Sequence, residues 1–191
     1  YGNVIIFNGD KQQGIKEINK ALELDPLSIS INWSLADRYF STREYDLAII
    51  QLQKTLNLSP DYISAKELLG RSLLQKKLYT QAIDVFTKLP TNSIFRSLLL
   101  SYAYGIAGDK ARAKTELDKS LREVSNPSPH FHFYLALAYM GQENYNEALT
   151  QLEKGYEMRI IFMVGLKMSP EFYPVRNEPR FKALMKKMNL D

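Results

Sequence analysis

Two histidines, His130 and His132, are the side chains of this sequence best suited to hold a metal ion or to move a proton near neutral pH. They lie two residues apart in a segment expected to be helical, so they point to different faces of that helix. A zinc-binding pair on a helix needs a spacing of three or four residues. The chain has no cysteine, which removes thiolate ligands, a thiol nucleophile and disulfides. We therefore expect no metal site, with one histidine packed in the fold and the other on a groove.

Other catalytic motifs are also missing. The closest glycine pair, Gly105 and Gly108, belongs to no phosphate-binding loop, and a helix C-cap accounts for Gly108. There is no Gly-x-Ser-x-Gly nucleophile motif. Paired carboxylates such as Glu143 and Glu147 have the spacing of ordinary helix-surface charges. The sequence thus predicts no enzyme activity and no cofactor for this segment, although an effector enzyme could be attached in a longer protein.

Composition and charge narrow the choice of partners. The chain has 191 residues, of which 45% are hydrophobic and 24% charged, as in a soluble globular protein. Its net charge of +4 arises entirely from residue 159 onward, and the rest is neutral. A basic tail without a basic stripe disfavours nucleic-acid binding. The longest apolar run, Ile160–Leu166, is too short to cross a bilayer. Localisation stays open between cytoplasm, slightly preferred, and periplasm. Because the chain begins with Tyr1, we expect a piece of a longer protein.

The elements that would position any site occur as internal repeats. A small residue followed four positions later by a large apolar one recurs five times, at Gly14, Ala48, Ala82, Ala113 and Ala148. A large residue followed by a small one also recurs five times, beginning at Tyr1, Leu35, Leu69, Leu100 and Leu135. Both patterns keep the same spacings of 34, 34, 31 and 35 residues. Two patterns with one irregular spacing indicate five copies of one structural unit.

Each copy has the periodicity of two helices. Leu35, Ala36 and Tyr39 fall on one face of a first helix, and Ala48 and Leu52 fall on one face of a second. A short polar connector, residues 41–44, separates them. Pro60 follows the second helix and disfavours helical geometry in the residue before it. The pattern predicts antiparallel helical hairpins whose small residues let the helices approach closely.

A 34-residue hairpin of this kind, with a tyrosine opening the second helix and Leu-x-Pro at its end, resembles the tetratricopeptide repeat. The resemblance implies an all-α fold, a right-handed superhelical solenoid of about five helical hairpins with a C-terminal capping helix. We expect the repeats at about 1–28, 29–62, 63–93, 94–128 and 129–158, and a capping segment at 159–191. The third repeat departs from the pattern, because it is three residues short.

The tail predicts the cap. Phe181, Leu184, Met185 and Met188 form an amphipathic stripe after Pro179, and a solenoid needs a cap over its last apolar face. We expect four residues to fill that face: Phe172, Tyr173, Val175 and Phe181. The order Pro170-x-Phe172-x-Pro174-x-Arg176 and then Glu178-Pro-Arg-Phe181 also resembles the end of tetratricopeptide regions in large bacterial signalling and regulatory proteins. In those proteins the effector is an N-terminal winged-helix domain, a class III nucleotide cyclase or a protein kinase.

The resemblance also implies a binding surface, because the first helix of each tetratricopeptide repeat lines a concave groove. The corresponding residues here are Trp33, Asp37, Phe40, Glu67, Arg71, Leu98, Tyr102, Phe133 and Leu137. Their aromatic and apolar character favours a protein partner that offers a peptide or helix. The segment is then a non-catalytic interaction or sensing module and a scaffold for signalling or transcription regulation in a bacterial protein. Three alternatives stay open: these side chains pack on one another, the segment forms a homodimer of an attached effector, or it senses a small molecule.

Overall fold

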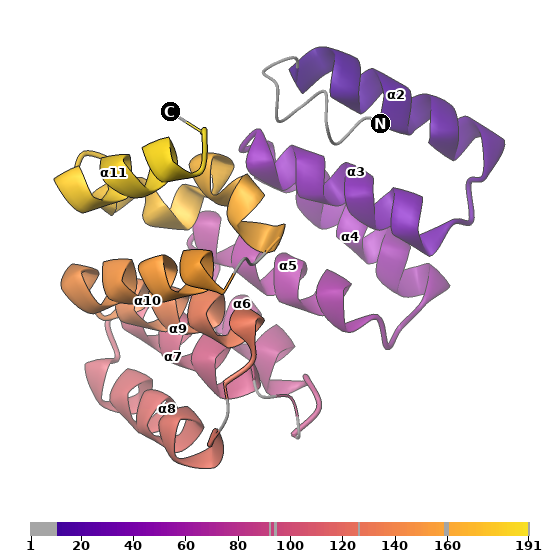
Figure 1. The fold of residues 1–191 in the computed structure, drawn as a ribbon. Helices are drawn as coiled ribbons and strands as arrows, with labels where there is room; N and C mark the ends of the chain where they lie inside the picture. The colour runs from indigo at the N-terminus through magenta and orange to yellow at the C-terminus, as the bar shows by residue number, and fades with distance from the viewer. Residues whose placement is uncertain (1–10, 92, 94, 126, 159–160, 191) are drawn as a thin grey trace. The chain divides into compact units, whose positions relative to one another are not determined.

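The computed structural model describes residues 11–91, 93, 95–125, 127–158 and 161–190. These residues form α-helices, short 3-10 helices and turns, with no strand among them, which confirms the predicted all-α class (Figure 1). The expected first helix of the first repeat, with Tyr1 and Gly2, lies outside the described residues.

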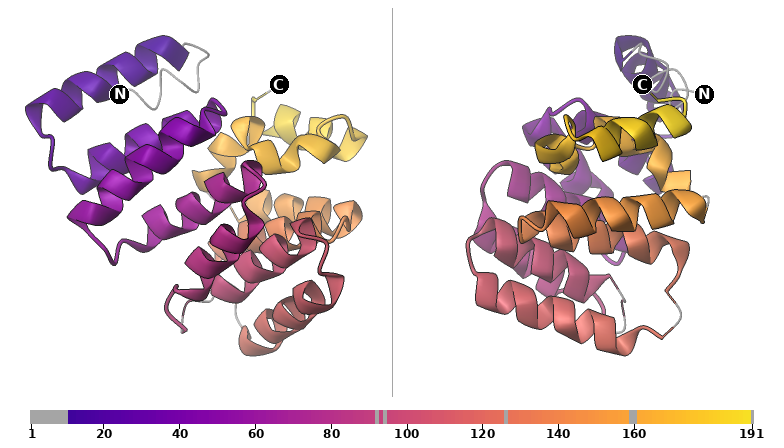
Figure 2. Two further views of the ribbon diagram at one scale, coloured as in Figure 1. Left: turned by 180° about the vertical axis from the view of Figure 1, so that it is seen from behind. Right: turned by 60° about the vertical axis from the view of Figure 1, so that its left-hand side comes forward.

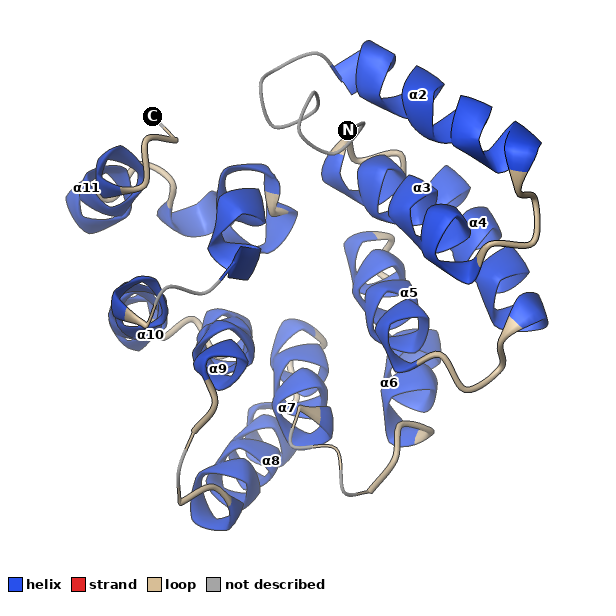
Figure 3. Ribbon diagram, turned by 45° about the vertical axis from the view of Figure 1, so that its right-hand side comes forward, coloured by secondary structure: helices blue, strands red, loops and turns tan. Residues whose placement is uncertain are grey.

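The chain divides into two compact units, Tyr1–Val85 and Phe86–Asp191, and each is described here by itself. The first unit contains α2 (Lys11–Leu24), α3 (Ile29–Ser41), α4 (Tyr45–Leu58) and α5 (Ile63–Gln75), and α6 (Tyr79–Thr87) crosses the boundary. The second unit contains α7 (Arg96–Ile106), α8 (Lys110–Glu123), α9 (Pro129–Gly141), α10 (Tyr145–Glu157), η1 (Ile161–Met168), η2 (Pro170–Val175) and α11 (Pro179–Lys187). Figures 2 and 3 show these helices from further sides.

Within each unit the helices form antiparallel hairpins that stack on their neighbours. In the first unit α3 packs against α2 and α4, and α4 packs against α5. In the second unit α7 packs against α8 and α9, and α9 packs against α10. The small repeat residues Ala36, Ala48, Ala113 and Ala148 have no exposed surface. They are therefore fully buried within the packed helices, as expected for the small positions of the repeat pattern.

Replacing Ala48 by leucine should destabilise the α3–α4 hairpin. The larger side chain has no free volume at this fully buried position, so the helices must separate or adopt strained rotamers. Overpacking of this kind costs roughly 1–3 kcal/mol of unfolding free energy. Urea denaturation followed by circular dichroism measures the loss. An Ala111→Leu variant, which makes the same substitution at an exposed position of α8, is the control and should change stability little.

Buried polar pairs join the two helices of a hairpin at equivalent places. In the α3–α4 hairpin, Gln51 Nε2 donates to Asn32 Oδ1 at 2.5 Å. In the α9–α10 hairpin, His132 Nδ1 lies 2.8 Å from Gln151 Oε1 and therefore donates its proton to that oxygen. Each pair is buried and has the same separation of 19 residues along the chain. His132 is thus the packed histidine, and His130 is exposed.

The hairpin turns share one backbone conformation. A residue with positive φ recurs at Arg43, Lys77, Gly108 and Glu143, with φ between 59° and 87°. The next backbone N–H then donates to a carbonyl five residues earlier, as from Asp109 to Tyr104 at 2.8 Å. Glycine adopts this left-handed conformation without steric cost, which explains Gly108. The three other turns carry a larger residue in the same conformation.

The tail closes the second unit. η1 and η2 pack against α9, and α11 packs against α10. Phe172 and Val175 are fully buried, and Phe181 is nearly so, as predicted for capping residues. The prediction that Tyr173 is also a capping residue is wrong. Its side chain is 48% exposed, because the 3-10 geometry of η2 turns it outward beside Phe172. The Arg176 guanidinium lies over one face of the Tyr173 ring, with Cζ 4.2 Å from the ring centroid.

Candidate functional site

The nine residues predicted for the groove divide between the two units. Five belong to the first unit: Trp33, Asp37, Phe40, Glu67 and Arg71. Four belong to the second unit: Leu98, Tyr102, Phe133 and Leu137. All lie on α3, α5, α7 or α9, the helices that open the hairpins. The two sets differ in how much of their side chains remains accessible.

In the first unit the predicted residues form a partly open face of α3 and α5. Trp33, Asp37 and Arg71 keep partial exposure, whereas Phe40 and Glu67 are buried. The Arg71 guanidinium carbon lies 4.8 Å from the centroid of the Phe40 ring, a cation–π geometry that joins α5 to α3. The face therefore offers an indole from α3 and a guanidinium from α5, of which the guanidinium lies over the buried Phe40 ring.

Asp37 adds a carboxylate to this face. Its Oδ2 accepts from Nη2 of the neighbouring Arg38, whose side chain is almost wholly buried. The Trp33 Nε1 atom is buried and has no hydrogen-bond acceptor. Trp33 therefore contributes apolar ring area to the face and no hydrogen bond to the fold.

In the second unit the predicted residues are part of the core. Leu98 and Leu137 have no exposed surface, and Tyr102 and Phe133 retain less than a tenth of theirs. Leu98 belongs to a cluster with Leu117, Phe131, Leu135 and Ala138. This burial favours the alternative that the aromatic and apolar residues at these positions pack on one another.

Phe133 shows why the sequence did not distinguish these roles. Its ring meets that of Phe172 edge to face, with centroids 5.7 Å apart. The partner residue belongs to η2 and lies 39 residues later in the chain, beyond the reach of a repeat pattern. This position, which was predicted to line the groove, thus contacts the tail.

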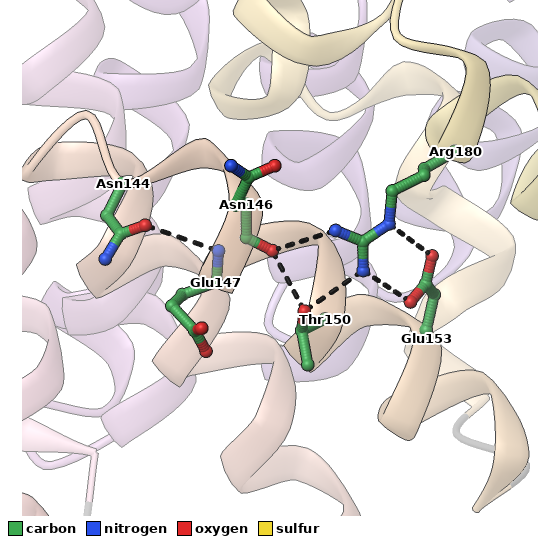
Figure 4. A network of polar contacts seen from close by, with 6 residues as sticks. All are labelled: Asn144, Asn146, Glu147, Thr150, Glu153 and Arg180. Carbon is green, nitrogen blue, oxygen red and sulfur yellow. Dashed lines mark hydrogen bonds and ion pairs between the residues drawn. The ribbon is translucent and has the colours of Figure 1, made fainter.

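The tail is also held by a charged network that the sequence analysis did not identify (Figure 4). Arg180 of α11 donates from Nε to Glu153 Oε1 at 3.0 Å and from Nη2 to Glu153 Oε2 at 2.7 Å. It also donates to Thr150 Oγ1 at 3.0 Å and to the Asn146 carbonyl at 3.3 Å. One guanidinium thereby contacts nearly two turns of α10. The available signal was Arg180 itself, in the Glu-Pro-Arg-Phe motif of the tail.

This pairing shifts both ionisation equilibria. The hydrogen bonds from Arg180 hold the pKa of Glu153 below its ordinary value of 4.5. In turn, the hydrogen bonds to Glu153 raise the pKa of Arg180. Both side chains keep about two fifths of their surface exposed, so solvent weakens the pair. The arrangement fixes the orientation of α11 more than it adds free energy.

Glu153→Gln should lower stability modestly at neutral pH, by roughly 0.2–1 kcal/mol, the range measured for exposed ion pairs. Because the folded-state pKa of Glu153 lies below 4.5, the contribution is complete above that pH and is lost as pH falls through the folded-state pKa. The parent and variant melting curves should therefore converge in acid. Glu157→Gln removes an exposed acid of the same helix and should change stability little. Equal pH profiles for the two variants would contradict the assignment.

Among the described residues, no cluster of three or more His, Asp or Glu side chains could hold a metal ion. No helix within the described part of the chain is both long and apolar enough to cross a membrane.

Comparisons with known proteins agree with this architecture. A family model described as tetratricopeptide repeat matches residues 36–95 and 98–159. A comparison with curated protein sequences found no match.

Several solved structures are similar at low sequence identity. A tetratricopeptide repeat protein from Parabacteroides merdae is 16% identical, with a TM-score of 0.65 over 89% of this chain and 67% of that chain. A thermophilic tetratricopeptide repeat protein from Thermus thermophilus is 17% identical, with a TM-score of 0.62 over 90% and 95% of the two chains. MamA is 22% identical, with a TM-score of 0.57 over 83% and 94%. These likenesses concern the fold. Since the family model covers more than half of the residues, the chain belongs to the tetratricopeptide repeat family.

Proposed function

We propose that the first unit binds a peptide or helix of a partner protein on the face formed by Trp33, Asp37 and Arg71. The tetratricopeptide fold supports a protein–protein interaction module. The site is chosen because equivalent positions of the repeat differ in side-chain exposure. The position of Trp33 is occupied in the second unit by Leu98 and Phe133, and that of Asp37 by Tyr102 and Leu137. All four of these side chains are buried, whereas Trp33 and Asp37 keep accessible surface.

The chemistry of the face indicates the kind of segment it binds. The Trp33 ring offers apolar area, and tryptophan and arginine are the residues most often found at binding hot spots. Asp37 and Arg71 supply one charge of each sign, so the face has no strong preference for an acidic or a basic partner. We infer a peptide or helix with one large apolar anchor and flanking polar groups.

The wider context belongs to the same proposal. The tail sequence from Pro170 to Phe181 supports a place in a larger bacterial regulatory or signalling protein, in which this segment recognises a partner and another domain acts. Tetratricopeptide repeats typically contribute recognition rather than catalysis, which supports a non-enzymatic role.

Substitution of Trp33 tests the site. A random peptide library displayed on phage is selected against the parent protein, and the affinity of a selected peptide is measured by calorimetry. Trp33→Ala should weaken that peptide by about thirtyfold, the equivalent of a 2 kcal/mol hot spot, with a melting temperature close to that of the parent. Trp33→Phe is the matched control: it keeps an aromatic ring and removes an N–H that has no acceptor in the fold.

Two results would contradict the proposal. One is a selected peptide that binds Trp33→Ala as tightly as the parent. The other is a large fall in melting temperature for Trp33→Ala with peptide affinity intact, which would make the ring a packing residue. Core aromatics typically cost about 3–5 kcal/mol when truncated, so the two roles are easily separated.

A further inference from the structure

Helix α4 differs from every equivalent helix in the chain. Its residues Leu47 and Ile50 are aliphatic, and equivalent positions elsewhere are polar or charged. The equivalents of Leu47 are Gln13, Gln81, Arg112 and Glu147. The equivalents of Ile50 are Lys16, Asp84, Thr115 and Thr150. The repeat architecture therefore does not require apolar residues here, and their presence in α4 alone calls for another cause.

These aliphatic side chains are accessible. Leu47 is 43% exposed and Ile50 is 50% exposed, and Leu58 further along the helix is 39% exposed. With Lys54 they fall on one face of α4, separate from the buried positions Ala48 and Leu52. We call Leu47, Ile50, Lys54 and Leu58 the α4 stripe. The residues of α4 that are buried where it packs on α3 and α5 are others, including Ala48 and Leu52, so the stripe leaves apolar surface accessible.

The charges beside the stripe are self-complementary. Asp46 lies four residues before Ile50 and Lys54 lies four residues after it. Lysine recurs at the position of Lys54 in every repeat, but an acid at the position of Asp46 occurs only in α4. If a second α4 crosses the first antiparallel with Ile50 at the twofold axis, Asp46 of each helix lies opposite Lys54 of the other. The same crossing brings the two Ile50 side chains together and places each Leu47 beside them.

The ion pair that Asp46 already forms within its own chain is compatible with this arrangement. Lys76 Nζ donates to Asp46 Oδ2 at 2.8 Å, and the Asp46 side chain is 74% exposed. Its second carboxylate oxygen can accept from another lysine. An exposed ion pair of this kind is weak and does not compete strongly with a new contact.

We propose that the α4 stripe is the interface of a homodimer in which two copies of this chain pair their α4 helices antiparallel about Ile50. This interaction is separate from peptide binding by Trp33, which lies on α3. The fourteen residues of α4 span about 21 Å, so the buried area is at the small end for specific complexes. The dimer is accordingly a weak one, with a dissociation constant on the order of micromolar or above, and an attached domain of the same chain would be brought near its copy.

Sedimentation velocity over a concentration series is the first test. The parent should move from the monomer mass of 22.0 kDa toward twice that value as concentration rises. Ile50→Lys should remain monomeric throughout. Leu121→Lys, at an aliphatic residue of α8 with a similar exposure of 43%, should associate like the parent. A parent that stays at 22.0 kDa, or an Ile50→Lys variant that associates like the parent, overturns the proposal.

Charge reversal tests the antiparallel geometry. Asp46→Lys and Lys54→Asp should each weaken self-association at least tenfold, because each variant places like charges opposite one another. An equimolar mixture of the two should associate, since the lysines of one variant then face the aspartates of the other. Thermal melts confirm that both variants are folded. Failure of the mixture to associate, while the parent dimerises, would overturn the crossing about Ile50.

Discussion

Phe172→Ala is expected to lower the unfolding free energy by roughly 3–5 kcal/mol, the typical cost of truncating a fully buried phenylalanine. The ring is inserted from η2 against Phe133 of α9 with centroids 5.7 Å apart, so its loss opens a cavity between the tail and the last hairpin. For a domain that is stable by about 5–15 kcal/mol, this is a large fraction of the total. Urea denaturation followed by circular dichroism gives the value directly.

The adjacent aromatic supplies the matched control. Tyr173 is 48% exposed and contacts the Arg176 guanidinium at the surface, so Tyr173→Ala should cost no more than about 1 kcal/mol. Equal effects of the two substitutions would mean that η2 is not held as a cap. Deleting residues from Pro170 onward should be more severe, because it also uncovers the apolar surface of α10 that Phe181 and Leu184 cover. The truncated protein should aggregate or lose helical signal beyond that of the deleted residues.

The repeats could be predicted from the sequence because each unit repeats the same local physics. Ala48 and Ala148 lie where two helices meet, and only a small side chain fits there. The same position recurs in each unit, so five weak signals support one another. The polar connectors similarly predict turns, and the structure adds the positive φ at Arg43 and Glu143 that a residue type alone does not reveal.

The candidate site was harder to predict because exposure depends on partners distant in the sequence. Trp33 and Phe133 hold equivalent positions in their repeats, yet Phe133 is covered by Phe172 of the tail. Arg180 likewise had no assigned role, because its acceptors on α10 lie 27 to 34 residues earlier. Repeat patterns describe what the units share. The features that distinguish one unit from another, including the α4 stripe, come from departures from those patterns.

The roles of Gly105 and Gly141 likewise could not be predicted from the sequence, because each glycine contacts a helix of a neighbouring hairpin. Their substitution is expected to have the second large effect. Gly141 lies at the end of α9, where this helix crosses α7. A Cβ atom added to Gly141 would lie 2.6 Å from the Tyr102 carbonyl oxygen and 2.9 Å from its Cα. A Cβ added to Gly105 of α7 would collide with the Gly141 carbonyl group. Sequence reasoning assigned no such contact to Gly105, because its partner lies in the next hairpin.

Gly141→Ala should therefore destabilise the second unit, by roughly 1–3 kcal/mol or more, since the backbones of α7 and α9 must separate. The direction of the change in unfolding free energy distinguishes this close contact from an ordinary glycine in a helix. In a helix without such a contact, replacing glycine by alanine stabilises by about 0.5–1 kcal/mol, because alanine has the higher helix propensity. Gly105→Ala should behave in the same way, and the two losses should not add, since either substitution already separates the same pair of helices.

The nature of the obstructing atoms sharpens the test. The closest atoms to the added Cβ of Gly141 are backbone atoms of Tyr102, and its ring carbon Cδ2 is farther, at 3.0 Å. Shortening that side chain therefore cannot relieve the clash. We expect the double variant Gly141→Ala with Tyr102→Ala to lose at least as much unfolding free energy as the two single variants lose together, when all are measured by urea denaturation. Recovery of stability in the double variant would place the obstruction in the Tyr102 ring, and a more stable Gly141→Ala single variant would mean that α7 and α9 do not cross this closely.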